Sequence, residues 1–598
     1  MKKDKNKLYG MKKIILTEIS QNCFSGIQCQ FYQFPTLHLQ RVNACLVILS
    51  VVKKQVFRSL LIYMVLFGWA GINNGHTQND DIPVAPDKYR KPRGYDPLKN
   101  SYEHSLPELK KKFSETMIRR AATEYNRLTE INNNGKWKPT AESIDAHKTP
   151  EWFEDCKFGM FIDWGLWSVA GWAPQKDKAV CYPNLYELEI YENLDFIKYH
   201  AKNWSKDFER DDFIPFFTAK NFNPERLVDL AAESGVKYII PACKQFSGFC
   251  LWSSSYTFRD AEDMQRKNII EPLAKRCKSK ELKFGFYFSL DEWEYPVING
   301  AGALEYRRWG GTMYPYTPEI EKKASGKVAV KNFAKEYIIP QAIEFIDAYN
   351  PDILWYDGEW DTPAEQSGSY EIAAYFYNKT EGEKEVAVND RYGTINGKWL
   401  RAVRGDIFTG EYDSIQKELK NNRVREEKRG MSRSFGFNWQ DSEKNIDTSK
   451  ELINTFVDIV SQGGNLLLVV NLDGQGALPE IQEKRLKEIG KWLKINGAGI
   501  YSTRTYTVAS EGDIRYTRSK DNKTVYAISL GWPGKQLTLK SVKPADGSDI
   551  YLLGEKEPLE WNYDNGATTI TLPDKLQKES NRPCRDAYTF SIQKTINN

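Results

Sequence analysis

The residues best placed to do chemistry stand at the end of an apolar run, where Asp357 lies between Trp355 and Trp360. Residues 353–356 have the size and β-propensity of a short buried strand, and Gly358 ends it. Asp357 is therefore expected at the carboxyl end of a strand, where α/β barrels carry their active sites. Aromatic rings cover the apolar face of a pyranose while a carboxylate attacks or stabilises an oxocarbenium-like carbon. The segment predicts sugar chemistry; an Asp that only caps a following helix is the alternative.

Composition narrows the class of protein. The chain has 598 residues, roughly three or four domain equivalents at ~150 residues each, and one barrel can absorb two of them. Its net charge is only +4 and no long block of one sign occurs, so the sequence predicts no nucleic-acid partner. Aromatic residues make up 13% of the chain, with 17 Trp and 33 Tyr, and a sugar-binding cleft is a natural place for part of them.

Between residues 151 and 501, apolar strand-like runs alternate with amphipathic helical ones. The strand-like runs include 159–162, 238–241, 284–288, 353–356 and 465–470. The helical runs include 224–234, 269–278, 334–349 and 450–462. The alternation predicts an α/β fold, namely a (β/α) barrel of regular or irregular TIM type. We prefer the barrel to an open doubly wound sheet, because no GxGxxG motif follows an early strand.

The pattern differs on both sides of this region. Residues 78–150 combine an exposed linker, a helical segment at 106–128 and a polar connection at 129–150. Residues 502–598 carry short alternating runs separated by Gly, Pro, Asn and Asp, which predict a C-terminal all-β sandwich. Those runs lie at 505–508, 514–516, 524–529, 536–539, 549–552 and 568–572. We expect the sandwich to brace the barrel, and glycan binding by the sandwich is the alternative.

The N-terminal region has the pattern of an export signal. Basic residues at 53, 54 and 58 precede an apolar run at 60–72, and small and polar residues follow it. This pattern begins some fifty residues late, so we interpret residues 1–77 as a misassigned extension plus a signal peptide, with the true start near Val51 or Val52. A membrane anchor is the alternative, but the run is shorter than the ~20 apolar residues of a spanning helix. The mature protein is predicted to be periplasmic or extracellular, with no stable membrane span.

No metal or organic cofactor is predicted. Beyond the leader, the cysteines are widely spaced and form no CxxC pair, so neither a zinc site nor a dense disulfide framework is indicated. No phosphate-cradling glycine loop occurs either. The five histidines all precede position 201, so histidine acid–base chemistry is excluded at the later strand ends of the barrel.

Seven segments carry a family resemblance. They are 152–165, 244–249, 355–360, 388–391, 434–438, 463–468 and 488–501. In this order they resemble the retaining α-L-fucosidases of glycoside hydrolase family 29, of which the chain is identified as a divergent member. The resemblance covers about 350 residues. It implies a catalytic barrel followed by a β-sandwich, in agreement with the expectation from the sequence pattern.

The resemblance also implies roles for single residues. Asp357 matches the family's nucleophile, which attacks the anomeric carbon and forms a glycosyl-enzyme intermediate. Trp355 and Arg391 match positions that line the sugar pocket, and Phe435 matches an aromatic residue against the apolar edge of the sugar.

This chain departs from the family at three sugar-binding positions, which lie in two segments. It has Asp163 and Trp164 where the family has His-Trp, and Gln245 and Phe246 where the family has a His-His pair. An acceptor-only carboxylate and an apolar ring replace hydrogen-bonding imidazoles, so the pattern of sugar hydroxyls that the site recognises must change.

The acid/base residue is not fixed by the sequence. Relatives carry a Glu about nine residues before the motif at 434–438, where this chain has Arg425. Glu426 follows immediately and is the first candidate; Glu411, after the barrel-end sequence 404–406, is the second. The alternative for 425–429 is a solvated charged turn. Asp291 and Glu292 stand at another strand end, where sugar binding and a plain turn role are both open.

Three hypotheses about function remain. The first is a retaining α-L-fucosidase-like glycoside hydrolase that acts on α-L-fucosides or a related sugar, with an oligosaccharide or glycoconjugate as substrate. The second is a carbohydrate-binding relative with impaired catalysis, which Arg425 favours. The third is a surface scaffold whose β-sandwich binds glycan. Asp357, Trp355 and Arg391 favour the enzyme.

Overall fold

The structure is a computed structural model. It describes residues 82–95, 106–175, 179–261, 268–308, 311–323, 326–360, 362–398, 403–412 and 423–594. All of them belong to one compact unit, Ile82–Asn598. The predicted extension and signal peptide at 1–77 lie outside the described residues. Within the described part of the chain, no helix is both long and apolar enough to span a bilayer.

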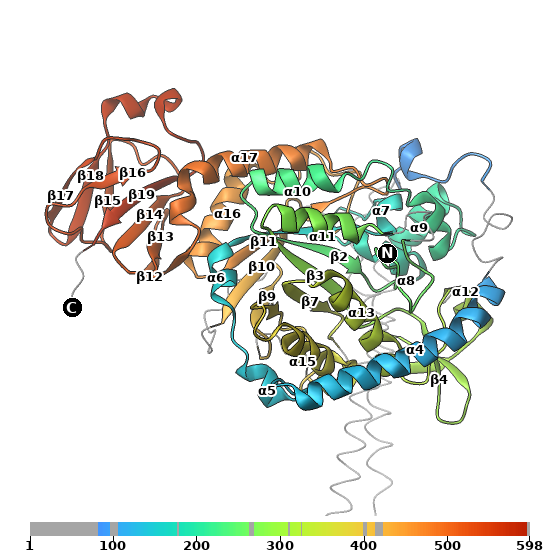
Figure 1. Cartoon of the computed structure of the whole chain (residues 1–598). Coiled ribbons are helices and arrows are strands. Elements are labelled where there is room, and N and C mark those ends of the chain that lie inside the picture. Colours follow the sequence, from blue (N-terminus) through green and yellow to red (C-terminus); the bar gives the residue numbers. More distant parts are fainter. Residues whose placement is uncertain are drawn as a thin grey trace, which may run out of the picture. The chain divides into compact units, whose positions relative to one another are not determined.

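Eight parallel strands form the barrel, in the order β8-β7-β3-β2-β1-β11-β10-β9. They are β1 (Phe158–Asp163), β2 (Tyr238–Lys244), β3 (Lys283–Ser289), β7 (Ile353–Asp357), β8 (Ala387–Val388), β9 (Ile407–Gly410), β10 (Val424–Gly430) and β11 (Asn465–Asn471). A parallel bridge between Asn389 and Ile407 joins the two ends of the sheet, so the barrel is nearly closed. The predicted barrel fold is confirmed (Figure 1).

The strands divide their side chains between two cores because successive residues point to opposite faces. On β1, Phe161 faces inward and packs with Tyr287 and Trp355. Its neighbours Met160 and Ile162 face outward into the larger core beneath the helices. The inward residues at the carboxyl ends of the strands therefore meet at one end of the barrel, as the sequence predicted for Asp357.

Helices surround the barrel (Figure 1). They are α4 (Leu106–Asn134), α5 (Ala141–Ala146), α6 (Glu151–Cys156), α7 (Trp167–Ala170), α8 (Tyr186–Glu192), α9 (Leu194–Asn203), α10 (Pro224–Glu233), α11 (Ile270–Ser279), α12 (Pro318–Lys323), α13 (Ile339–Tyr349), α14 (Ala364–Ser367), α15 (Ser369–Thr380), α16 (Ser449–Ser461) and α17 (Glu480–Asn496). The four predicted helices of the barrel region correspond to α10, α11, α13 and α16. The segment before α13, Ala334–Ile338, is a π-helical turn. The expected polar connection at 129–150 is partly helical, because α4 runs to Asn134 and α5 follows.

Two features of the barrel region differ from the sequence interpretation. The connection from β3 to β7 contains a three-stranded antiparallel sheet of β4 (Tyr295–Ile298), β5 (Leu304–Arg307) and β6 (Met313–Pro315). The charged run at 425–429 is no solvated turn, because it forms β10, where Glu426, Glu427 and Lys428 are buried. A barrel strand with a polar interior face does not show the apolar pattern that marks its neighbours.

The C-terminal region consists of two antiparallel sheets that share a core, as predicted for a sandwich. The larger sheet has the order β12 (Thr503–Glu511), β13 (Ile514–Ser519), β14 (Thr524–Ser529), β19 (Tyr588–Gln593) and β16 (Ile550–Leu552). The smaller one has the order β15 (Gln536–Leu539), β18 (Ala567–Thr571) and β17 (Glu560–Asp564). The sequence pattern missed β17 and β19. Trp492 of α17 donates to the backbone oxygen of Ala587 at 2.9 Å, a contact between the helical layer and the sandwich.

Candidate active site

Asp357 ends β7 with its carboxylate held from three directions. Arg391 donates to Oδ1 at 2.8 Å, and the backbone N–H of Gly358 donates to the same oxygen at 3.1 Å. The Tyr287 hydroxyl, on the neighbouring strand β3, donates to Oδ2 at 2.7 Å. The carboxylate is 9% exposed. These donors stabilise its negative charge and fix its orientation, as a nucleophile requires.

Arg391 connects Asp357 to a second carboxylate. Its Nη1 binds Asp357, and its Nη2 donates to Oε1 of Glu411 at 2.7 Å. Its Nε donates to Thr409 of β9 at 3.1 Å, which fixes the guanidinium plane. Burial lowers the pKa of Arg391, but Glu411, Asp357 and Glu359 more than offset this, so its pKa lies above the ordinary value and the group stays charged. Two carboxylates thus lie within the span of one guanidinium.

Trp355 and Tyr287 form the floor of the site. Their rings stack at a centroid distance of 5.4 Å, and the Arg391 guanidinium lies 4.6 Å above the Trp355 ring. Below the floor, Trp355 donates through Nε1 to Glu426 at 2.8 Å, and the Tyr238 hydroxyl donates to the same carboxyl group at 2.6 Å. Trp355 therefore separates Glu426 from Arg391.

The two acid/base candidates differ in access. Glu426 is fully buried, and burial raises its pKa to about 7 although hydrogen bonds from Tyr238 and Trp355 oppose the rise. Both of its oxygens are occupied by donors inside the barrel. The Glu411 side chain is 19% exposed, and Arg391, which also binds Asp357, binds its carboxylate. Glu411 is therefore the more accessible of the two carboxyl groups.

Asp163 and Lys428 complete the interior of this end of the barrel. Asp163 ends β1 and is fully buried; Asn184 donates to its Oδ2 at 3.3 Å, whereas its Oδ1 has no hydrogen-bond partner among the described residues. Burial raises the pKa of Asp163 to about 6, against the charge of Lys428. Lys428 on β10 reaches within 3.8 Å of Glu411. We call Asp163, Asp357, Arg391, Glu411 and Lys428 the site cluster.

An aromatic wall lies near the carboxyl end of β7, which carries Asp357. Its members are Phe246, Trp293 and Trp360, with ring centroids of Phe246 at 5.7 Å from Trp293 and 5.2 Å from Trp360. Gln245, next to Phe246, contacts the Tyr287 hydroxyl at 2.8 Å. The contacting atom of Gln245 is its amide oxygen Oε1, so the single proton of the Tyr287 hydroxyl faces two acceptors, Oε1 of Gln245 and Oδ2 of Asp357. Gln245 thereby helps to orient Tyr287.

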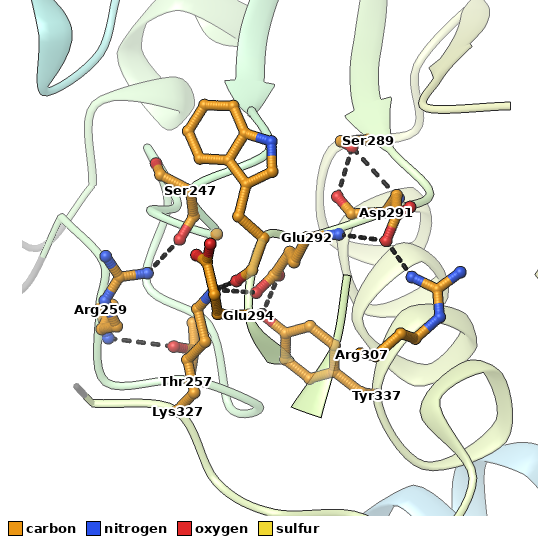
Figure 2. Close-up of polar contacts among 12 residues, drawn as sticks. Ser247, Thr257, Arg259, Ser289, Asp291, Glu292, Glu294, Arg307, Lys327 and Tyr337 are labelled. Atoms are coloured by element: carbon orange, nitrogen blue, oxygen red, sulfur yellow. Dashed lines mark hydrogen bonds and ion pairs between the residues drawn. The ribbon is translucent and has the colours of Figure 1, made fainter. Parts of the chain in front are cut away.

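A buried ionic network holds the loops that carry this wall (Figure 2). Glu292 lies 3.1 Å from the ammonium of Lys244 and 3.6 Å from that of Lys327, and Tyr337 donates to it at 2.6 Å. Lys327 also donates to the backbone oxygen of Trp293. We call Lys244, Glu292, Lys327 and Tyr337 the wall network. It joins the carboxyl ends of β2 and β3 to the segment before α13.

Asp291 and Glu292 are thus engaged away from the site. Asp291 pairs with Arg307 of β5, and Glu292 belongs to the wall network (Figure 2). Both residues are at most 3% exposed. Their place at the end of β3 serves the loops, and of the two roles left open by the sequence the structure favours the turn.

Phe435 comes from the segment after β10 and closes the opposite side. Its ring stacks on Tyr182 at 5.6 Å and meets Tyr412 edge-on at 5.4 Å. The ammonium of Lys428 lies 5.0 Å from the Phe435 ring.

Among the described residues, no group of three or more His, Cys, Asp or Glu could hold a metal ion.

Comparison with known proteins identifies the family. The family model described as Alpha-L-fucosidase matches residues 125–498. The chain belongs to the α-L-fucosidase family. A second model, the Alpha-L-fucosidase C-terminal domain, matches residues 509–593. The resemblance found in the sequence is confirmed, and the protein is a glycoside hydrolase of this family.

Individual relatives agree with this assignment. The plasma alpha-L-fucosidase of Homo sapiens is 29% identical over 485 residues, which cover 77% of this chain and 93% of the relative. The alpha-L-fucosidase of Branchiostoma floridae is 27% identical over 470 residues, which cover 77% of this chain and 96% of the relative. The crystal structure of Thermotoga maritima alpha-fucosidase with a mechanism-based inhibitor is 30% identical, with a TM-score of 0.62, and the match covers 77% of this chain and all of that one.

Within this fucosidase fold, most of the predicted site residues converge, but Glu426 lies beneath Trp355 and Trp164 lies outside the barrel interior. Trp164 points to the outer core, where its indole packs against Phe217 and Phe222 and donates to the backbone oxygen of Asp473 at 2.7 Å. It is 1% exposed, so the structure does not bring it to the sugar. Strand alternation contains the signal: if Asp163 faces inward, Trp164 must face outward.

Two residues of the site were missed by the sequence interpretation. Tyr287 was treated only as part of an apolar strand, although its register with Trp355 places it on the inward face. Lys428 was placed in a charged run with a turn as the alternative. The alternation of buried residues along β10 reveals its inward position.

Proposed function

We propose that this protein is a retaining α-L-fucoside hydrolase in which Asp357 is the nucleophile and Glu411 the acid/base. The observation that carries the proposal is the bridging of the two carboxylates by Arg391, at 2.8 and 2.7 Å. Retaining glycosidases need two carboxyl groups only about 5–5.5 Å apart, and a shared guanidinium supports such a spacing. The mechanism-based inhibitor bound by the Thermotoga relative supports the covalent route.

The proposed reaction proceeds in two displacements. Asp357 attacks the anomeric carbon and forms the glycosyl ester, while the bond to the leaving oxygen breaks and Glu411 supplies the proton to that oxygen. Water then attacks the anomeric carbon, Glu411 takes its proton, and Asp357 leaves as carboxylate. Arg391 and Tyr287 hold Asp357 before attack and stabilise its returning charge.

The alternative is a carbohydrate-binding relative with impaired catalysis. Arg425 supports it, because this residue stands where relatives carry a Glu. In the structure Arg425 pairs at 2.6 Å with Glu427, which lies two residues further along the same strand, β10. Glu411 supplies a carboxylate beside Asp357 instead, which supports the enzyme.

Turnover of an aryl α-L-fucoside with a good leaving group tests the nucleophile. We expect the parent protein to hydrolyse it and Asp357→Ala to lose on the order of 10⁴-fold or more in kcat. An activated leaving group needs little help from a proton donor, so this assay isolates the role of Asp357. Absence of turnover by the parent would favour another sugar, and then the binding protein.

The acid/base assignment is tested with Glu411→Gln and Glu426→Gln. We expect Glu411→Gln to lose about 10²- to 10⁴-fold on a natural fucoside but much less on the activated one in the first step. Added azide should restore turnover of the activated substrate and give a fucosyl azide. The matched Glu426→Gln change should lack this rescue, and the reverse result would assign the acid/base to Glu426.

We further propose that the protein is exported, as the pattern at 53–77 supports. N-terminal sequencing of the mature protein from its native host should find a start after residue 72. A mature protein that begins within residues 1–60 would exclude this proposal.

A further inference from the structure

Two buried polar groups of the site cluster keep unused hydrogen-bonding capacity. The Lys428 side chain is 5% exposed, yet its ammonium donates no hydrogen bond to the part of the chain that the structure describes. Oδ1 of Asp163, which is fully buried, accepts none. Buried ammonium and carboxylate groups normally have partners, because leaving them without partners costs folding free energy. Such capacity at an active site indicates groups kept for a ligand.

The surroundings of Lys428 direct its ammonium toward the sugar. The nitrogen lies 4.4 Å from the ring centroid of Phe161, 5.2 Å from Trp355 and 5.0 Å from Phe435. These rings stabilise the cation through their faces but accept no conventional hydrogen bond. Trp355 and Phe435 are the residues that the family resemblance assigns to the pocket, so the ammonium lies within the space between them.

Neutralising Glu411 does not account for Lys428. The two groups are 3.8 Å apart, beyond hydrogen-bond distance, and Arg391 already binds Glu411 at 2.7 Å. Asp163 follows Phe161 on the same inward face of β1, and the charge of Lys428 lowers its pKa against the effect of burial. The ammonium and the free carboxylate oxygen therefore face the same space.

We infer that Lys428 and Asp163 form a subsite for the hydroxyl groups of the glycone, in which Lys428 donates to a hydroxyl oxygen and Asp163 accepts a hydroxyl proton. This inference rests on the proposed function. A sugar hydroxyl both accepts and donates, so one hydroxyl or two neighbouring ones satisfy both protein groups. Lys428 is then a determinant of specificity: a glycone without that hydroxyl leaves the ammonium without a hydrogen-bond acceptor. The site cluster has more acidic than basic members, which favours a neutral glycone over an anionic one.

The test pairs a protein change with a substrate change. Lys428→Met keeps an unbranched side chain of nearly the same length and removes the donors, and Lys198→Met, at an exposed position of α9, is the matched control. The substrates are an aryl α-L-fucoside and its three monodeoxy analogues, each without one ring hydroxyl. We expect Lys428→Met to lower kcat/KM on the full fucoside by about 10- to 100-fold, as for a hydrogen bond to a charged group. On one deoxy analogue the same change should cost less than about 3-fold, because the partner hydroxyl is already absent.

The outcomes separate the inference from the proposed function. An equal loss on the fucoside and on all three analogues, with the melting temperature of the parent retained, would overturn the inference while the fucosidase activity stands. If the parent shows neither turnover of fucoside nor binding of L-fucose by calorimetry, the proposed function fails and the inference fails with it. Should Lys428→Met fold poorly, Asp163→Asn is the second variant, and it must show selective loss for the same or a neighbouring hydroxyl.

Discussion

Two clusters of buried charge lie at the carboxyl end of the barrel, and they differ in how far their members satisfy one another. In the wall network, Oε1 of Glu292 contacts Lys244 and Tyr337, Oε2 has the ammonium of Lys327 at 3.6 Å but accepts no hydrogen bond, and Lys327 also binds a backbone carbonyl. In the site cluster, Lys428 donates no hydrogen bond within the described structure, and Asp163 keeps one acceptor unused. The first arrangement stabilises loops, whereas the second reserves groups for a ligand.

This difference shows that burial and charge alone do not identify a functional residue. Lys244 and Lys428 are both buried and both lie near aromatic rings, at 4.2 Å from Phe288 and 4.4 Å from Phe161. Their carboxylate distances separate them, at 3.1 Å for Lys244 and 3.8 Å for Lys428. Functional sites commonly give up stability in this way to retain groups with unused hydrogen-bonding capacity.

The largest expected effect is the loss of stability on Lys244→Met. It leaves the buried carboxylate of Glu292 without its nearest cation, and breaking a buried pair in this way costs about 3–5 kcal/mol. Lys428→Met should change stability by less than about 1 kcal/mol, because Glu411 keeps Arg391 and because Asp163, with a pKa of about 6, can take up a proton. Urea unfolding of both variants, with Lys198→Met as control, measures the contrast.

Equal destabilisation by the two variants would remove the distinction between the clusters. Activity provides the converse comparison: Lys428→Met should lower kcat/KM while the free energy of unfolding stays close to that of the parent. Residual activity of folded Lys244→Met should show mainly a raised KM, because the wall network positions Phe246 and Trp293 and contributes no reacting group.

The second effect is a pH dependence of stability that comes from Glu426, which is buried beneath Trp355. Glu426 has a pKa of about 7 in the folded protein against an ordinary value of 4.5, so the folded state holds this proton more tightly than the unfolded chain does. Its contribution is therefore fully present below pH 4.5 and is lost as the pH rises to 7, by up to about 3 kcal/mol. We expect Glu426→Gln to flatten the fall in stability between pH 5 and pH 7.5.

Asp163 and Glu187, with pKa values of about 6 and about 7, contribute in the same direction, so a residual slope should remain in the variant. The control is Glu480→Gln at an exposed position of α17, which should leave the slope unchanged. A Glu426→Gln protein with the full slope of the parent would show that Glu426 is ionised in the folded state.

The contrast between the clusters also explains how far the sequence predicts this molecule. Apolar runs identified β1, β2, β3, β7 and β11, because strands buried on both faces are continuously hydrophobic. The same rule missed β10, where Glu426 and Lys428 occupy the interior face. A barrel strand that carries charged side chains on its interior face breaks the apolar pattern by which strands are recognised.

The sequence predicts a site residue well when its position follows from the end of one strand. It does not predict contacts between side chains that come from different strands. Asp357 follows from the end of β7, and of the residues that the resemblance named, Arg391 binds Asp357 and lies over Trp355, while Phe435 lies near Lys428. The choice between Glu411 and Glu426 depends on which one faces Arg391 across the barrel. Counting along the chain cannot give that contact, since it joins residues of different strand ends.

The third prediction concerns space within the wall network. Gly248 has φ +82°, and an added Cβ would lie 2.3 Å from Oε2 of Glu292. Gly566 in the sandwich has φ +79° and no atom within 4 Å of such a Cβ. Alanine at either position incurs the left-handed strain of about 1–2 kcal/mol. Gly248→Ala must also displace a carboxylate held by Lys244 and Tyr337, which should cost a further ~1–3 kcal/mol.

Thermal unfolding of the two alanine variants measures this difference directly. A Gly248→Ala protein that is no less stable than Gly566→Ala would mean that Glu292 can move freely. In that case the wall network would not hold this carboxylate in a fixed position.

The smallest effect is expected where charges pair near the surface. Arg504 of β12 contacts three carboxylates of α6, at 2.8 Å for Asp155, 3.0 Å for Glu154 and 3.1 Å for Glu151. It has as many partners as Glu292, but water reaches this group, since Glu151 is 67% exposed. We therefore expect Arg504→Met to cost about 1 kcal/mol or less, and the cost should shrink further in ~1 M salt. Unfolding measured at low and high salt decides the matter: a salt-independent loss as large as that of Lys244→Met would mean that the number of partners, and not their burial, sets the strength of these ionic networks.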